Sequence, residues 1–97
     1  MAEHTFIIRD LPVNSYFHDL TTGLSESCFE RDVAIRFRIL KHNEINFHSH
    51  TTTDLHIVFK TLHDAKYDFR KLLQHYVDYY NDTKWMKRFD MKVSIDS

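Results

Sequence analysis

The sequence has very few of the residues that interrupt regular structure or form covalent cross-links. Its 97 residues include one glycine (Gly23), one proline (Pro12) and one cysteine (Cys28). A lone cysteine excludes an internal disulfide, which fits a protein of the reducing cytosol. A lone glycine excludes the glycine-rich loops that hold phosphates in nucleotide-binding proteins. The scarcity of chain breakers predicts short connections between regular elements.

The sequence also lacks an excess of charge and a long apolar run. Its 13 Lys and Arg against 14 Asp and Glu give a formal net charge of −1 at pH 7, not the basic surplus of a general nucleic-acid binder. No apolar run approaches the roughly 20 residues that span a bilayer, and the N-terminal residues do not have the pattern of a signal peptide. We therefore expect a soluble, cytoplasmic protein with no membrane partner.

Composition and length predict one globular domain covering residues 1–97. The sequence is 42% apolar and 28% charged, which is typical of a folded chain. The chain is long enough for one hydrophobic core of modest size and too short for a second domain.

The N-terminal third of the chain is expected to form a strand and then a short helix. Residues 4–9 are β-branched and aromatic, and Pro12 follows them, so they predict a strand. Residues 15–22 have apolar positions near helical spacing, and Gly23 suits the position just after a helix.

The middle of the chain alternates between apolar and polar residues with a period of two. The alternation runs from residue 32 to residue 60, and polar triplets interrupt it at 41–43 and 51–53. This pattern predicts a three-stranded antiparallel meander. The residues expected to face the core are Val33, Ile35, Phe37, Phe47, Ile57 and Phe59.

The last third changes period and predicts a long amphipathic helix over 62–82, followed by a strand over 89–96. Thr61 and Asp64 resemble a capping box at the start of the helix. The apolar stripe of the helix consists of Leu62, Ala65, Phe69, Leu72, Leu73, Tyr76 and Tyr80. The expected fold is α+β, a single small domain in β-α-β-β-β-α-β order, with the long helix covering one face of an antiparallel sheet.

The polar face of the predicted meander carries basic side chains and histidines. Loops at 41–43 and 51–53 would place Arg36, His48 and His56 in one row across three strands. One interpretation is a zinc site formed by His48, His50 and His56, with Asp54 as a further ligand. The favoured interpretation is an exposed polar face rich in histidine, because Arg36 in the same row repels a divalent cation.

Two aromatic residues near the end of the predicted long helix exceed what its apolar stripe requires. Tyr79 and Trp85 are of the types that dominate binding hot spots. The alternative is that Trp85 folds back over the core. Cys28 likewise has two interpretations, a nucleophile paired with a histidine or a small buried hydrophobe, and the second is the commoner case.

No catalytic or cofactor motif is present, so the sequence predicts a non-enzymatic protein that binds another macromolecule, such as an interaction or inhibitor protein of a phage or mobile element acting on a host factor. One alternative is a small metal- or ligand-binding domain that uses the histidine face. A third is a nucleic-acid-binding regulator that acts through Arg36, Arg38 and Lys60. The expected partner is another protein, with a nucleic acid or a second copy (a homodimer) as alternatives. The partner-binding residues are expected to be Arg36, Arg38, His48, His56, Tyr79 and Trp85.

Overall fold

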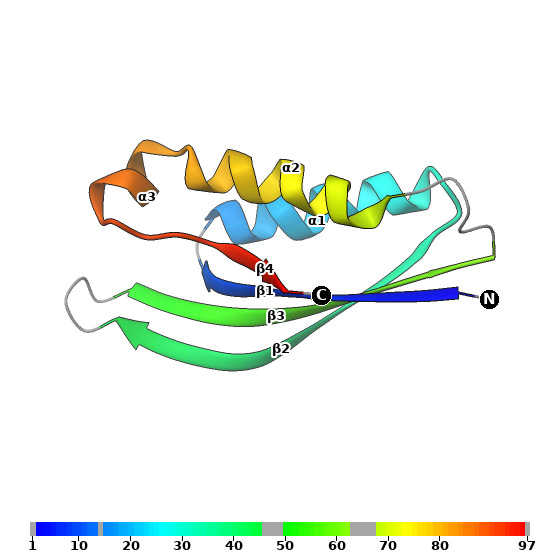
Figure 1. Ribbon diagram of the computed structural model, residues 1–97, viewed down its shortest axis with the longest axis horizontal. Coiled ribbons are helices and arrows are strands. Elements are labelled where there is room, and N and C mark those ends of the chain that lie inside the picture. The colour runs from blue at the N-terminus through cyan, green and yellow to red at the C-terminus, as the bar shows by residue number, and fades with distance from the viewer. Residues whose placement is uncertain (1, 14, 46–49, 63–67, 97) are drawn as a thin grey trace.

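The computed structural model describes residues 2–13, 15–45, 50–62 and 68–96. Helices α1 and α2 lie over one face of an antiparallel sheet, so the molecule has two layers (Figure 1). The elements in chain order are β1 (Ala2–Pro12), α1 (Ser15–Phe29), β2 (Ala34–Ile45), β3 (His50–Thr61), α2 (Phe69–Asn81), α3 (Lys84–Arg88) and β4 (Ser94–Asp96). The predicted α+β class, with helices on one face of an antiparallel sheet, is confirmed.

The strands are arranged in the order β2-β3-β1-β4, and every neighbouring pair is antiparallel. With α3 set aside, this is the split βαβ topology of ferredoxin-like folds. The strand β2 lies at one edge along its whole length. At the other edge, the described residues of β4 pair with residues 7–9 of β1.

The predicted three-stranded meander is wrong, because β2 and β3 form one long hairpin. Their pairing runs from Ala34 opposite Lys60 to Ile45 opposite His50, and the connection 46–49 lies outside the described residues. Both expected loops, 41–43 and 51–53, belong to strands. The threonines of 51–53 are β-branched and favour a strand. A bulge between Ile39 and Lys41 shifts the register without ending β2.

Helix α1 runs through Gly23 to Phe29 instead of ending at the glycine. The backbone of Gly23 has no positive φ, so the residue does not act as a C-terminal cap. Its role is close packing, because a Cβ atom at this position would lie 2.8 Å from the hydroxyl oxygen of Tyr76 on α2. The missing side chain therefore lets the two helices approach each other.

Helix α2 begins later than the sequence pattern predicted. Asp68 is its N-cap, and the carboxylate accepts a hydrogen bond of 3.3 Å from the backbone N–H of Lys71. The expected cap was wrong, since Thr61 is the last residue of β3, and Asp64 and Ala65 lie outside the described residues. Leu62 is 72% exposed and does not belong to the helix. The buried residues of α2 are Phe69, Leu73, Val77 and Tyr80.

The C-terminal segment contains a short helix that was not expected, and its strand is shorter than the one expected over 89–96. Helix α3 is capped by Thr83, whose hydroxyl accepts from the backbone N–H of Met86 at 3.3 Å. The side chain of Asn81 then makes two hydrogen bonds to the backbone of Val93, at 2.8 and 2.9 Å. Asn81 thus takes the place of a strand neighbour for Val93, and pairing with β1 begins only at Ser94.

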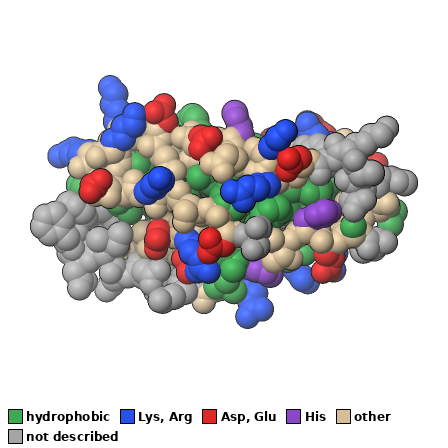
Figure 2. Space-filling view, viewed as in Figure 1, with side chains coloured by type: hydrophobic (Ala, Val, Ile, Leu, Met, Phe, Trp, Pro, Cys, Tyr) green, Lys and Arg blue, Asp and Glu red, His purple; other side chains and the backbone are tan. Residues whose placement is uncertain are grey.

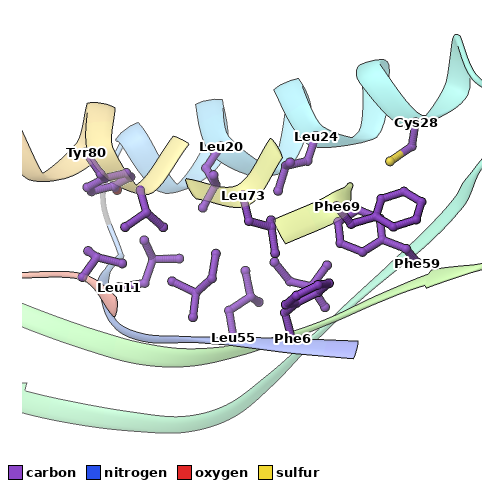
Figure 3. Packing of buried hydrophobic residues seen from close by; sticks show 14 of the residues in the cluster. Phe6, Leu11, Leu20, Leu24, Cys28, Leu55, Phe59, Phe69, Leu73 and Tyr80 are labelled. Atoms are coloured by element: carbon purple, nitrogen blue, oxygen red, sulfur yellow. The ribbon is translucent and has the colours of Figure 1, made fainter. Parts of the chain in front are cut away.

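The core lies between the helices and the sheet (Figure 3). Phe59 of β3 stacks on Phe69 of α2 with ring centroids 4.5 Å apart, and Phe6 of β1 meets the same Phe59 edge-on at 6.0 Å. The residues predicted to face inward do so where they are described, since Val33, Ile57 and Phe59 are buried and Ile35 and Phe37 pack against the core. Phe47 lies outside the described residues.

Candidate protein-binding surface

The face of the sheet that points away from the helices is polar and basic on β2. Arg36 and Arg38 are exposed on this open face, because they alternate with Ile35 and Phe37, which pack against the core. Arg38 pairs with His56 of β3, and Arg36 pairs with Val58. The expected exposure of both arginines is confirmed, but the expected pairing of Arg36 with His48 is not, since Val58 occupies that position.

Carboxylates neutralise the other described cations of the open face. Arg9 of β1 pairs with Asp54 at 3.2 Å and with Asp96 of β4. The hydrogen bond and charge of Asp96, followed by the charge of Asp54, raise the pKa of Arg9. The ammonium group of Lys60 lies 3.1 Å from the carboxylate of Glu3. The basic residues Arg9 of β1 and Lys60 of β3 therefore each have a carboxylate partner.

The two arginines of β2 differ from these paired cations. Within the described part of the chain, no carboxylate forms an ion pair with Arg36 or Arg38. Figure 2 shows basic and acidic side chains interspersed over the face of the molecule that it presents. Among the described arginine and lysine residues of the open face, those without an acidic partner therefore lie on β2.

The strand β2 also offers a free backbone edge. It is 12 residues long, it contains no proline, and among the described strands its only neighbour in the sheet is β3. Ile39 and Leu40 on this strand are 44% and 43% exposed. A long edge strand with exposed apolar side chains is a template for pairing with another chain. We define the β2 surface as the free edge of β2 together with Arg36, Arg38, Ile39 and Leu40.

The histidines of the predicted zinc site are not brought together where they are described. His50 and His56 both belong to β3 and lie six positions apart, which corresponds to about 20 Å along a strand. Metal ligands lie within about 2 Å of the ion, so this backbone separation does not bring the two strand positions to one site. His48 lies outside the described residues. Among the residues that the structure describes, no group of three His, Cys, Asp or Glu side chains could hold a metal ion.

Tyr79 and Trp85, which were also expected to bind a partner, do not lie on the open face with the arginines. They belong to α2 and α3, in the layer on the other side of the sheet (Figure 1). Trp85 is partly buried against the core and meets Phe89 edge-on at 5.6 Å, which is the arrangement expected of an aromatic that covers the core. Tyr79 is 64% exposed and remains accessible.

Two features were missed by the sequence reasoning. The first feature is the exposure of Ile39 and Leu40, which fit the alternating pattern of an ordinary strand in the sequence. The edge position of β2 makes both side chains accessible to a partner. A pocket between α1 and α2, lined by Asp19 and Tyr79 among others, joins segments about 60 positions apart. The run of tyrosines at 76, 79 and 80 was a signal for this pocket, but the contribution of α1 could not be seen.

Cys28 is 1% exposed and belongs to the core. Burial raises the pKa of its thiol, so little of the nucleophilic thiolate forms near neutral pH. The buried position supports the interpretation of Cys28 as a small hydrophobe.

Comparisons with protein-family models, with curated proteins and with solved structures found no match for this chain. In the described part of the chain, no helix combines the length and the apolar character needed to cross a membrane. Because a fold by itself does not define an activity, a function can rest only on the geometry of a site such as the β2 surface.

Proposed function

We propose that this chain is a non-enzymatic binding protein that recognises an acidic, extended segment of another protein along β2. The observation that carries the proposal is that the free edge of β2 bears two arginines that have no acidic partner among the described residues. Addition of a strand to an exposed sheet edge is a common form of peptide recognition, in which the backbone supplies affinity and the side chains supply specificity.

The alternation along β2 defines what an added strand would meet. On the open face, its side chains would lie opposite Arg36 and Arg38, so acidic residues are favoured there. On the helix side, its side chains would lie near Phe37 and the exposed Ile39, so apolar residues are favoured there. The preferred partner therefore alternates acidic and apolar residues.

A second copy of this chain fits the same edge poorly. In an antiparallel pair of β2 strands centred on Phe37, Arg36 of each copy lies opposite Arg38 of the other. Registers shifted by one pair of residues place Arg36 opposite Arg36, or Arg38 opposite Arg38. Directly opposed like charges destabilise a strand pair, and charged residues on edge strands are a known protection against self-association. These repulsions favour a different, acidic partner over a homodimer.

The test uses a peptide as long as β2 that alternates glutamate with valine, and a counterpart with lysine in place of glutamate. We expect the glutamate peptide to bind in a fluorescence anisotropy titration and the lysine peptide not to bind. The double variant Arg36→Glu/Arg38→Glu should bind the glutamate peptide at least about tenfold more weakly, equivalent to about 1.4 kcal/mol.

The matched control is Lys84→Glu/Lys92→Glu, which changes the net charge by the same amount at exposed positions outside the β2 surface. If both double variants lost the same affinity for the glutamate peptide, general charge attraction would explain the binding. That result would contradict the proposal. A random DNA duplex serves as a second ligand. Binding of the duplex but not of the glutamate peptide, lost on substitution of the two arginines, would instead indicate a nucleic-acid-binding regulator.

A further inference from the structure

The pocket between α1 and α2 is separate from the β2 surface and has a different chemistry. Its volume is about 240 Å³. The residues that line it belong to α1 and α2, which cover the other face of the sheet (Figure 1), so an occupant would not touch the open face. The residues that line it are Asp19 and Leu20 of α1 and His75, Tyr76, Tyr79 and Tyr80 of α2.

Two of the three tyrosines are held in place by the fold. Tyr80 is buried, and its hydroxyl donates a hydrogen bond of 3.2 Å to the backbone carbonyl of Pro12. Tyr76 is half-buried and packs against α1 at Gly23, where a Cβ atom would lie 2.8 Å from its hydroxyl oxygen. Tyr79 also lines the pocket and is 64% exposed, so solvent reaches its ring. The aromatic wall is therefore largely preformed.

The pocket carries a carboxylate opposite these rings. Asp19 is exposed, and no cation or hydrogen-bond donor among the described residues pairs with it. Tyr79 and Tyr80 lie in the last turn of α2, where the helix dipole also favours positive charge. Aromatic faces next to a carboxylate attract cations, since the ring quadrupole and the formal charge act in the same direction.

We infer that this pocket binds the guanidinium group of an arginine side chain from a partner protein. A guanidinium is planar and weakly hydrated, so it stacks on a tyrosine ring while its N–H groups bond a carboxylate in a forked arrangement. An ammonium group is not planar and cannot form the forked pair of hydrogen bonds. A neutral side chain has no positive charge to pair with the carboxylate of Asp19. This inference does not depend on the function proposed for β2.

The test is an NMR titration of isotope-labelled protein at pH 8, where histidine is ordinarily uncharged. The probe is Nα-acetyl-arginine N-methylamide, and its citrulline counterpart has nearly the same shape without the charge. We expect saturable shifts of the backbone signals of Asp19, Leu20, His75 and Tyr79, with millimolar affinity. The citrulline probe should bind at least about tenfold more weakly. Equal binding of the two probes, or tighter binding of the lysine counterpart, would overturn the inference.

Substitutions locate the interaction. Asp19→Asn and Tyr79→Ala should each weaken binding of the arginine probe at least about fivefold, whereas Tyr79→Phe should retain most of it. The matched control is Glu26→Gln, an exposed acid-to-amide change on the same helix, away from the pocket. All these positions are exposed, and a spectrum with unchanged dispersion verifies the fold of each variant. If Asp19→Asn and Glu26→Gln weakened binding of the arginine probe equally, general charge attraction would explain the binding. That result would refute binding in the pocket.

Discussion

Leu55, Ile57 and Phe59 of β3 are at most 1% exposed under the helices, whereas Lys60 on the opposite face of the same strand is only half-buried. The two faces of the sheet therefore share a backbone and differ in what covers them. The covered face gains stability from apolar area removed from water. The open face keeps polar and charged groups that a partner can contact, at little cost to the fold.

Val58 on the open face is only 4% exposed, although none of the described helices lies over that face. It is not part of the hydrophobic core cluster. Its neighbours across the ladders are Thr5 of β1 and Arg36 of β2. Long arginine stems cover apolar neighbours while their charged ends stay in water. Arg36 is thus placed to shield Val58 and to present its guanidinium to a partner.

The largest expected effect is on the covered face. Phe69→Ala should lower the free energy of unfolding by about 3–5 kcal/mol, because it removes a buried ring stacked on Phe59. Lys71→Ala, at an exposed position of the same helix, should change it by no more than about 0.5 kcal/mol. Urea denaturation followed by circular dichroism measures both values. Similar losses at the two sites would show that α2 does not bury the face assigned to it.

A smaller effect is expected from truncation on the open face. Val58→Ala should cost about 1.5 kcal/mol, from two methylene equivalents at about 0.8 kcal/mol each. Ile57→Ala, its neighbour on the covered face, should cost about 2–5 kcal/mol, since a cavity remains in the core. The same denaturation experiment compares them. Equal costs would mean that Val58 lies in a second packed core on the open face.

The smallest effect is expected at the solvent-exposed ion pair between Asp82 and Lys87, whose oxygen and nitrogen atoms lie 2.9 Å apart. The hydrogen bond from Lys87, followed by its charge, lowers the pKa of Asp82 below that of the unfolded chain. The pair therefore stabilises the fold above the ordinary pKa of an aspartate, and this contribution disappears as the pH falls through the lowered pKa.

Stability measured between pH 2.5 and pH 6 should therefore depend slightly less on pH in Asp82→Asn than in the unchanged protein. The difference should be small, because both side chains are mostly exposed and solvent screens them. A large difference would show that Asp82 interacts with more than Lys87.

Local sequence patterns predicted the strands and the direction of their side chains better than the ends of the elements. The alternation of Ile35 and Phe37 with Arg36 and Arg38 correctly assigned the two faces of β2. The polar triplets at 41–43 and 51–53 were misread as loops, because polarity alone does not distinguish a turn from an exposed or bulged strand. The error displaced the predicted pairing of His56 and, with it, the expected histidine cluster.

The class of the fold and the core-facing side chains of β2 and β3 could be read from the sequence alone, since both follow from the periods of strands and helices. The tertiary structure alone decided that β2 is an edge, that β4 pairs with β1, and that Asp19 shares a pocket with Tyr79. Those relations join segments far apart in the chain, and they depend on how the elements pack. A repeating pattern indicates on which face of its helix or strand a residue lies, but not which residues of other elements it contacts.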